Sequence, residues 1–525
     1  MQYKVLLTTS GVGSRLGDLT KFTNKSLVTI GNKPAIAHIV EQYPQQVEFV
    51  VTLGYFGSHI RQFLEIAYPN RNFTFVEVEN YDGVGSSLGR SQLCARDHLR
   101  CPFIYNACDT IVSGSIPPVD HNWVGAKIGF GSSQYDSITV DADKNITSLH
   151  RKGYMDSTHI HIGLVGINDF DFYWKTMEKL YDAEPHKHSL SDVCAIEQML
   201  STGTSFKIVE FGEWCDIGNV VSLKKARERY KDKLNVLEKI EESISLVNGR
   251  IIKFFHNKEI ITKRVKRSGL LGDLTPNIID FKENFYAYDF VEGEVASLAI
   301  TPKRMKDLIQ WAEANLWKKR AYEGDFSKHC RYFYDTKTRS RIEAFFKNHN
   351  KDGEGFINGI KTPPVSQLLD KVPWEYLCDA SPHQFHGDFI LDNIVIDKNS
   401  NFKLLDWRDQ FGNGSMESGD VYYDLAKMNH NLTVNHDIVC RELFYTSISK
   451  EKVFCDILRK DNLVKCNKIF FEEIEKYGYD VNKVEMLTGI VWLNMSPLHH
   501  RPFDEFLFYY GKLKLFLALE NYYEQ

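Results

Sequence analysis

Residues 3–16 read YKVLLTTSGVGSRL, an apolar strand that runs directly into a loop with two glycines. Glycines just after a buried strand let the backbone turn tightly, so that its amide groups can face a phosphate. Arg15 adds a fixed cation beside such a phosphate, and Lys25 adds a second one that can follow charge in a transition state. The stretch predicts a phosphate-binding loop, with Gly11 and Gly13 at its turn.

Short apolar runs alternate with helical patterns from this loop onward. The expected strands are residues 3–8, 48–53, 73–78 and 103–106, and the expected helices are residues 35–43, 59–68 and 86–95. This alternation favours an α/β fold with a Rossmann-like, mainly parallel sheet and helices on both of its faces. Ligands of such sheets bind beyond the carboxyl ends of the strands, where the glycine loop and Asp109 are both expected.

Two other phosphate-binding loops do not fit these residues. Leu16 stands where a dinucleotide-binding loop has its third glycine, and no Gly-Lys-Ser/Thr sequence is present there to form a P-loop. For the glycine pair alone, a plain turn with surface bases is an equally good interpretation.

The longer segment of residues 11–20, together with residues 24–28 and 31–34, is more specific. It resembles the nucleotidyltransferases that join a nucleoside triphosphate to a sugar phosphate or to phosphocholine. The resemblance covers about residues 1–230. It implies that Gly11, Gly13 and Ser14 contact the nucleotide, and that a second loop does so through the residues Gly85 and Ser86.

The same resemblance implies a magnesium site and an acceptor site. Asp109 and Asp216 are similar to the two Mg²⁺ ligands of these enzymes, and Lys152 is similar to the lysine that holds the acceptor's phosphate. In such enzymes Mg²⁺ bridges the two substrates, a phosphate oxygen of the acceptor attacks the α-phosphorus, and pyrophosphate leaves. Asn24 and Cys108 depart from the family pattern, which has proline and glycine there, but neither change removes a charge that the chemistry needs.

A second motif lies in the C-terminal half, where residues 386–393 read HGDFILDN and an aspartate and a tryptophan follow at 406 and 407. In kinases, an aspartate orients the acceptor hydroxyl and accepts its proton, while an asparagine and a second aspartate hold Mg²⁺ against the ATP phosphates. Asp388, Asn393 and Asp406 have the spacing for these three roles. The motif therefore predicts a kinase site.

This half resembles the aminoglycoside phosphotransferase and choline kinase family from about residue 240 to the end. The resemblance implies a bilobal, α+β, protein-kinase-like fold in which His386 and Asp424 support the catalytic loop. It also implies nucleotide contacts from Lys253, which takes the place of the lysine on the α- and β-phosphates, and from Tyr288 and Phe290 at the hinge that meets adenine.

One element of that kinase pattern is displaced. An acid on the next helix should pair with the lysine on the phosphates. Glu259 is the candidate, although its spacing is poor, and Arg264 stands where the acid is expected.

The size and composition of the chain limit its organisation and its partners. A chain of 525 residues exceeds what one core usually supports. We therefore expect a nucleotidyltransferase domain of residues 1–232 and a kinase-like domain of residues 233–525, with lobes of about 240–295 and 296–525. The net charge of −5 gives no reason to expect nucleic acid or a membrane as partner. Ten cysteines without a CxxC pair indicate reduced thiols and a cytoplasmic protein.

The two motifs together predict a bifunctional enzyme with Mg²⁺ as cofactor. One half would use ATP to phosphorylate a small hydroxyl compound, a sugar or sugar-like polyol. The other half would transfer a nucleotidyl group from CTP, UTP or GTP to that phosphate, giving an activated precursor for capsule or lipopolysaccharide synthesis. Two alternatives stay open: a choline or ethanolamine kinase joined to a phosphocholine-type cytidylyltransferase, and an active nucleotidyltransferase with a catalytically weak kinase-like module. The sequence leaves the base and the oligomeric state open.

Overall fold

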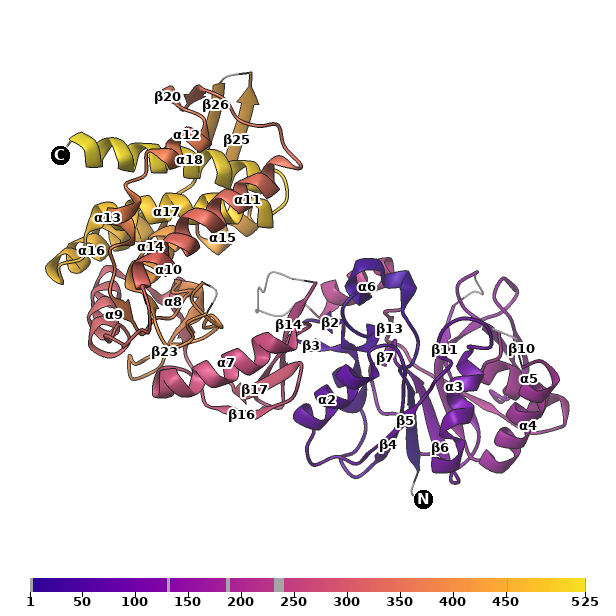
Figure 1. Ribbon diagram of the computed structural model, residues 1–525. Coiled ribbons are helices and arrows are strands. Elements are labelled where there is room, and N and C mark those ends of the chain that lie inside the picture. The colour runs from indigo at the N-terminus through magenta and orange to yellow at the C-terminus, as the bar shows by residue number, and fades with distance from the viewer. Residues whose placement is uncertain are drawn as a thin grey trace. The chain divides into compact units, whose positions relative to one another are not determined.

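The computed structural model describes residues 3–129, 133–185, 189–230, 240–412, 414–450 and 452–524. These residues form two compact units (Figure 1). The first comprises residues 1–261 and 279–290, and the second comprises residues 262–278 and 291–525. The predicted domain boundary between residues 232 and 233 lies outside the described residues and stays a prediction.

The first unit is built around a nine-stranded sheet whose middle confirms the expected strand–helix alternation. Four parallel strands lie in the order β6-β1-β4-β5. In chain order the elements are β1 (Lys4–Thr8), α1 (Ala35–Val40), β4 (Glu48–Leu53), α2 (Gly57–Ala67), β5 (Phe73–Glu77), α3 (Leu88–Ala95) and β6 (Phe103–Ala107).

The whole sheet is mixed, so the prediction of a mainly parallel sheet is wrong in this respect. The additional strands are β8 (Trp123–Ile128), β9 (Ser137–Val140), β10 (Ile146–His150), β11 (His159–Ile167) and β12 (Lys207–Glu210). β11 runs antiparallel to β6, β8 and β9, and β9 runs antiparallel to β10. A short turn joins β9 to β10, and such a connection permits only antiparallel pairing because a parallel pair needs a long crossover.

Helices cover both faces of this sheet, as expected. Val5 and Leu7 of β1 belong to the core that includes α1 and α2. Leu6, which points to the opposite face, belongs to a second core with α3, α4 (Phe170–Ala183) and α5 (Asp192–Ser201). The carboxyl ends of β1 and β6 therefore lie between two packed layers, where their loops have a fixed base.

A second sheet in this unit has four strands in the order β14-β15-β17-β16. Its strands are β14 (Glu242–Val247), β15 (Arg250–Phe255), β16 (Ile278–Phe281) and β17 (Phe285–Asp289). Asn248 and Gly249 have positive φ angles of 52° and 73°, as a tight hairpin turn between right-twisted strands requires. Asn248 and Gly249 therefore form the turn of the β14–β15 hairpin.

One face of this four-stranded sheet packs on α2. This packing explains why β14, β15 and most of the rest of the sheet belong to the first unit. Its inward residues share a core with α1 and α2: Val247, Ile252, Phe254, Phe285 and Ala287. The Asn284 N–H donates to Gln62 Oε1 at 2.9 Å, and Asn248 Nδ2 donates to the Ala67 carbonyl at 3.1 Å. The predicted kinase N-lobe thus shares its core with the first sheet.

The second unit is mostly helical. Its helices are the last part of α7 (Lys258–Leu271), α8 (Ala296–Ala299), α9 (Pro302–Asn315), α10 (Phe326–Arg331), α11 (Lys337–Phe346), α12 (Val365–Asp370), α13 (Trp374–Cys378), α14 (Val421–Thr433), α15 (His436–Cys440), α16 (Asp461–Lys476), α17 (Val481–Met495) and α18 (Phe503–Glu524). Two short strands, β22 (Ile394–Ile396) and β23 (Phe402–Leu404), pair antiparallel beside the predicted kinase motif.

A further sheet in this unit was not anticipated. It has the order β20-β19-β26-β25 and consists of β19 (Gly355–Ile357), β20 (Ile360–Thr362), β25 (Phe444–Ser449) and β26 (Lys452–Ile457). β19 and β26 are far apart in the sequence, so local patterns do not reveal their pairing.

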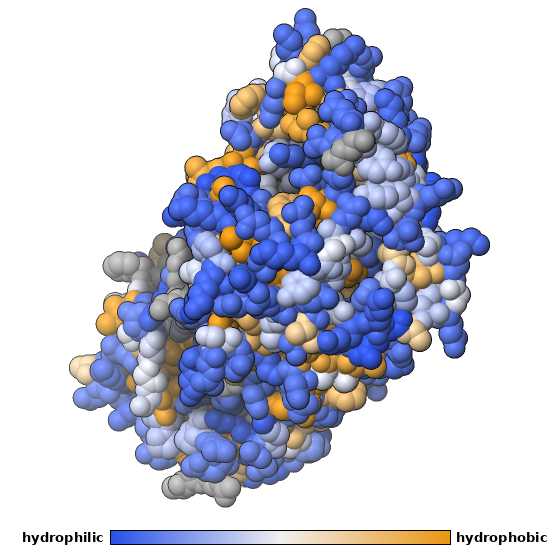
Figure 2. All heavy atoms as spheres, turned by 90° about the vertical axis from the view of Figure 1, so that its left-hand side faces the viewer, coloured by the Kyte–Doolittle hydropathy of each residue, from blue (hydrophilic) through white to orange (hydrophobic). Residues whose placement is uncertain are grey.

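The face shown in Figure 2 is mainly hydrophilic, with small and separate hydrophobic patches. Among the described helices, none combines the length and the apolar character that a membrane span requires.

The shared core predicts that Phe254 stabilises the first unit. Its ring lies 5.0 Å from that of His59 on α2 and 5.1 Å from that of Phe285. Phe254→Ala should lower the free energy of unfolding by about 3–5 kcal/mol, the usual cost of emptying a buried phenylalanine site. Phe281→Ala, at a 56% exposed ring of the same sheet, is the control and should change it by less than ~0.5 kcal/mol. If urea titrations gave the same loss of unfolding free energy for Phe254→Ala and Phe281→Ala, the sheet would not pack on α2.

Candidate active sites

A two-stranded ribbon brings the two predicted magnesium ligands of the first unit together. β13 (Trp214–Asp216) pairs antiparallel with β7 (Thr110–Val112), and this register sets Asp216 opposite Thr110. The Ile217 N–H also donates to the Asp109 carbonyl at 3.1 Å. Two acids 107 positions apart in the chain are thus neighbours at the carboxyl end of β6.

Arg15 reaches the same place. A Cβ atom added to Gly218 would lie 3.0 Å from Asp216 Oδ1, 3.2 Å from Arg15 Nη2 and 3.3 Å from Asp109 Oδ2. Both carboxylates and the guanidinium therefore border one small volume. Any side chain at position 218 would fill it, so glycine leaves room there.

Lys25 forms an ion pair with Asp109, with 2.9 Å between Nζ and Oδ2. Burial alone would lower the pKa of Lys25, but the Asp109 carboxylate outweighs it and raises that pKa above its usual value. Burial would likewise raise the pKa of Asp109, and Lys25 outweighs it and lowers that pKa. Both groups are therefore charged at neutral pH.

Asn24 fixes the backbone that carries Lys25. Its Nδ2 donates to the carbonyls of Thr9 at 2.8 Å and Tyr55 at 2.6 Å, and its Oδ1 accepts the Ser26 N–H at 3.0 Å. The asparagine that replaces the family's proline thus ties the end of β1 to the lysine. Gly13 has a positive φ of 70°, and a Cβ there would lie 2.8 Å from Lys25 Cβ.

Asp216 is held by groups that the sequence analysis missed. The Tyr135 hydroxyl donates to Oδ2 at 2.8 Å, Ser222 Oγ donates to the same oxygen at 3.3 Å, and the Gly218 N–H donates to Oδ1 at 2.7 Å. Ser222 is in the first turn of α6 (Val220–Arg229), so its spacing from Asp216 was the available signal. No sequence signal pointed to Tyr135, because only the fold brings its loop close to Asp216.

This donor set fits a magnesium ion. Mg²⁺ usually takes one or two carboxylates and completes its octahedron with water and substrate phosphates. Across the described residues, no cluster of three or more His, Cys, Asp or Glu side chains could hold a metal. A metal at Asp109 and Asp216 would therefore depend on two protein carboxylates and on the substrates.

The second predicted nucleotide-binding loop, with Gly85 and Ser86, leads into α3, and α3 bonds to the start of the glycine loop. Gly85 has a positive φ of 85°, and Ser86 Oγ donates to the Gly83 carbonyl at 2.7 Å. Behind them, Ser91 of α3 bonds Ser10 through their hydroxyls at 2.8 Å. This bond ties the start of the glycine loop to the helix that follows the second loop.

Lys152, the predicted phosphate-holding lysine, lies on an exposed loop. Its backbone N–H donates to Asp136 Oδ1 at 3.1 Å, and its side chain is exposed. The structure therefore does not bring it into contact with the pair of acids, and its role stays a prediction.

In the second unit, His386 and Asp424 support the predicted catalytic loop, as the resemblance implies. Asp424 accepts the N–H groups of His386 at 2.7 Å and Gly387 at 2.6 Å. Burial lowers the pKa of His386 to about 4. The neutral ring accepts the Asp388 N–H at Nδ1 and bonds the Leu405 carbonyl through Nε2, so it spans both parts of the motif.

Asp388 lies between an amide and a lysine. Asn393 Nδ2 donates to its Oδ2 at 3.1 Å, and Lys427 Nζ lies 2.7 Å from its Oδ1. Burial would raise the pKa of Asp388, but Lys427 outweighs it and lowers that pKa. The sequence analysis missed Lys427, which lies three residues after Asp424 on α14 and was open to recognition by that helical spacing.

Asp406 is next to Asn393 because the β22–β23 hairpin joins them, with the Leu405 N–H donating to the Asn393 carbonyl at 2.7 Å. Its φ is positive, at 57°. Arg264 Nη1 lies 2.6 Å from Asp406 Oδ1. The arginine that displaces the expected acid on α7 therefore pairs with the predicted metal ligand. One turn later, the buried Arg267 donates to the His386 carbonyl at 3.3 Å.

Lys253, Tyr288 and Phe290 belong to the first unit. Lys253 of β15 is buried and lies opposite Tyr286 of β17. Because side chains alternate along a strand, Lys253 and Tyr288 lie on the face that does not pack on α2. Phe290 follows β17 and is 45% exposed. Glu259 is exposed in the first turn of α7.

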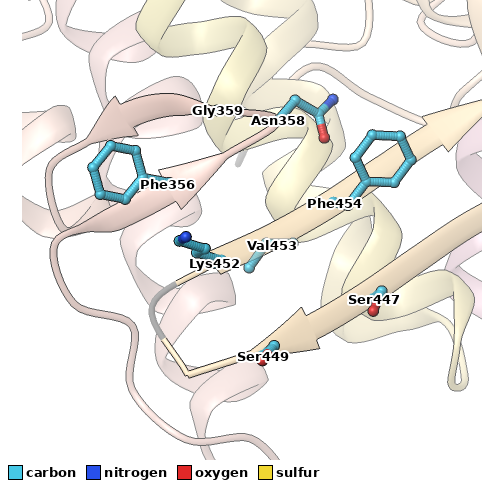
Figure 3. A pocket seen from close by; sticks show the side chains of 8 residues that line it. All are labelled: Phe356, Asn358, Gly359, Ser447, Ser449, Lys452, Val453 and Phe454. Carbon is cyan, nitrogen blue, oxygen red and sulfur yellow. The ribbon is translucent and has the colours of Figure 1, made fainter.

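A groove of about 540 Å³ lies on the unanticipated sheet of the second unit (Figure 3). Phe356 and Phe454 come from its adjacent strands β19 and β26, and Ser447 and Ser449 come from β25. None of the residues that line it is an acid. The groove therefore lacks the carboxylates that a Mg²⁺ site uses.

No protein-family model matches the chain. Over 258 residues, 47% of the chain, it is 25% identical to the bifunctional protein GlmU of Methanococcus maripaludis. Over 169 residues, 31% of the chain, it is 26% identical to a probable glucose-1-phosphate cytidylyltransferase of Bacillus subtilis. The chain covers 60% of the length of each of these two relatives. Its N-terminal part is therefore similar in sequence to nucleotidyltransferases.

Solved structures align with the same share of the chain. CTP:phosphocholine cytidylyltransferase from Streptococcus pneumoniae aligns over 44% of the chain and 100% of its own, with a TM-score of 0.37 and 16% identity. A putative glucose-1-phosphate thymidylyltransferase from Bacillus anthracis aligns over 45% of the chain and 98% of its own, with a TM-score of 0.38 and 17% identity.

The ion pair of Lys25 and Asp109 predicts how stability depends on pH. The lowered pKa of Asp109 stabilises the fold above the ordinary carboxyl range, and this contribution disappears as pH falls through that pKa. Lys25→Met leaves Asp109 without its ion-pair partner, so the variant should be less stable at pH 7, and the difference should narrow below about pH 4. Denaturant titrations at both pH values test this. The control variant Lys21→Met, at an exposed lysine, should show no such pH-dependent change in its stability relative to the unsubstituted protein. A loss of stability in Lys25→Met that is equal at both pH values would contradict the pairing.

Proposed function

We propose that the N-terminal half transfers a nucleotidyl group from a nucleoside triphosphate to the phosphate of a small acceptor, with Mg²⁺ as cofactor. The observation that carries this proposal is the convergence of Asp109, Asp216, Arg15 and Lys25 at the ends of strands that come from distant parts of the sequence. Two acids and two bases around one volume provide what a nucleoside triphosphate, an acceptor phosphate and a divalent cation require.

The chain's own residues would then divide the work. Asp109 and Asp216 would hold the cation, which supplies positive charge to the phosphates when it is bound. Arg15 and the glycine loop would bind the leaving pyrophosphate. Lys25 would follow the charge that develops on the α-phosphate, released from Asp109 as the cation takes its place. The protein needs no general base, because the attacking phosphate oxygen is already an anion.

A sugar phosphate is the acceptor we favour for this half. The relatives include a probable glucose-1-phosphate cytidylyltransferase and a low-salt glycan biosynthesis nucleotidyltransferase of Haloferax volcanii, which is 25% identical over 241 residues. Their names point to carbohydrate pathways, and we infer from them an activated precursor for a cell-surface glycan. The base of the nucleotide is left open among CTP, UTP and GTP.

We further propose that the C-terminal half supplies that phosphate from ATP. Asp388, Asn393 and Asp406 meet on one loop and hairpin, in the order that the kinase chemistry needs. Asp388 would orient the acceptor hydroxyl, and Asn393 and Asp406 would hold Mg²⁺. Arg264 would have to leave Asp406 when the metal binds. A weak kinase-like module is the alternative that this ion pair favours.

Loss of either acid should stop nucleotidyl transfer. Asp109→Asn and Asp216→Asn should each lower pyrophosphate release from a nucleoside triphosphate and a sugar 1-phosphate by about 100-fold or more, the scale of losing one electrostatic contact in the transition state. Asp143→Asn, at an exposed acid, is the matched control. Pyrophosphate release by both variants at the unsubstituted rate would refute the assignment.

A substitution in the C-terminal half should impair phosphorylation by ATP and leave nucleotidyl transfer unchanged. Asp388→Asn should lower phosphorylation of the acceptor by ATP about 10²–10⁴-fold, the contribution of a positioned base, and leave pyrophosphate release from a supplied sugar phosphate unchanged. Asp397→Asn, in the exposed turn after β22, should affect neither reaction. If ATP consumption continues undiminished in Asp388→Asn, the C-terminal half is not a kinase of this kind.

A further inference from the structure

A group of basic side chains lies beside Asp388, on the side away from its asparagine. Lys427 pairs with Asp388 at 2.7 Å. Tyr423, one turn earlier on α14, accepts a hydrogen bond from Arg408 Nη1 at 2.9 Å. Arg408 follows Asp406 by two residues, and a Cβ added to Gly387 would lie 2.5 Å from Arg408 Cβ. These bases therefore adjoin the loop that carries the proposed acceptor-orienting acid.

A third base approaches the group from another helix. Lys337 Nζ lies 4.3 Å from the centre of the Phe333 ring, and Arg408 Cζ lies 5.2 Å from the same ring. Phe333 itself packs edge-on against Tyr423 at 5.0 Å. Aromatic faces attract cations and carry no formal charge. We call Lys337, Arg408 and Lys427 the cationic cluster.

The backbone is distorted where Lys337 enters. A π-helical turn, residues Tyr332–Thr336, interrupts the helix between α10 and α11 directly before Lys337. Such turns are rare and are found frequently at functional sites, because they re-aim side chains at some cost in stability. Phe333, which contacts Arg408 and Tyr423, lies within this π-helical turn.

The cationic cluster has too little negative charge around it. Lys337, Arg341, Arg408 and Lys427 act on one another, and the acids that face them are Asp388 and Asp409. Asp388 is already paired with Lys427. Within the described residues, no carboxylate lies within ion-pair distance of Lys337 or Arg408. Burial and then the neighbouring cations lower the pKa of Lys337 to about 7, as expected for half-buried like charges without a counter-ion.

We infer that the compound phosphorylated at Asp388 carries a carboxylate or phosphate group, which binds to the cationic cluster while its hydroxyl meets Asp388. This inference rests on the proposed kinase function of the C-terminal half. An anion would relieve the repulsion among Lys337, Arg408 and Lys427 and would remain fixed relative to the reacting hydroxyl. Choline and ethanolamine, which are cations, would be repelled.

The test measures binding and phosphoryl transfer separately on the full chain. Isothermal titration compares glycerol 3-phosphate with glycerol, and glucuronate with glucose, so that phosphate and carboxylate are each set against a neutral analogue; choline is the cationic probe. Each titration is repeated with a non-hydrolysable ATP analogue and Mg²⁺. The variants are Lys337→Met and Arg408→Met, with Lys347→Met at an exposed lysine beyond the end of the same helix as control.

We expect at least one anion to bind more tightly than its neutral analogue by 10-fold or more, and this preference to be lost in both cluster variants and kept in the control. Lys337→Met should leave the melting temperature unchanged or raise it, because a repelling charge is removed. A purely structural lysine would lower it.

Other outcomes are equally informative. Tighter binding of choline or of the neutral compounds, anion binding that the variants leave intact, no anion binding at all, or displacement of the anion by the ATP analogue would each overturn the inference. Anion binding by the cluster without any transfer from ATP, in a screen of anionic fractions of a metabolite extract, would uphold the binding site and refute the kinase function instead.

Discussion

A carboxylate that is partly shielded from water is stabilised by a nearby cation, and this constraint shapes both candidate sites. Asp109 is paired with Lys25, Asp388 with Lys427, and Asp406 with Arg264. In each case the protein supplies the balancing charge from a different element of the fold. A divalent cation brought in with a polyphosphate can take over that role, and the freed base is then available to the phosphates.

The pairings also explain why the sites depend on tertiary structure. The β7–β13 register places Asp216 beside Asp109, and the β22–β23 hairpin places Asp406 beside Asn393. Side chains that hydrogen-bond to backbone carbonyl and amide groups fix the loops of both sites. These side chains are Asn24 in the first unit and His386 and Asp424 in the second. Polar residues that are buried and fully bonded define these two loops.

The sequence predicted what depends on local pattern. The alternation of strands and helices up to β6 follows from the spacing of apolar residues, and the expected supporting positions of His386 and Asp424 came from a resemblance carried by a local motif. The pairing of β11 with β6 and β8, the core shared by the β14–β17 sheet and α2, and the contact of Tyr135 with Asp216 depend on residues far apart in the chain. Propensity and periodicity contain no information about such pairings, and a search for acids and glycines overlooks the bases that balance them.

The central claim is that Asp109 and Asp216 exchange their protein partners for a metal bound to nucleotide. A crystal structure with Mg²⁺ and a non-hydrolysable nucleoside triphosphate tests it most directly. The account predicts one metal ion between the two carboxylates, with Lys25 Nζ moved from Asp109 onto a phosphate. Nucleotide bound elsewhere, with the Lys25–Asp109 ion pair intact and no metal between the acids, would contradict it.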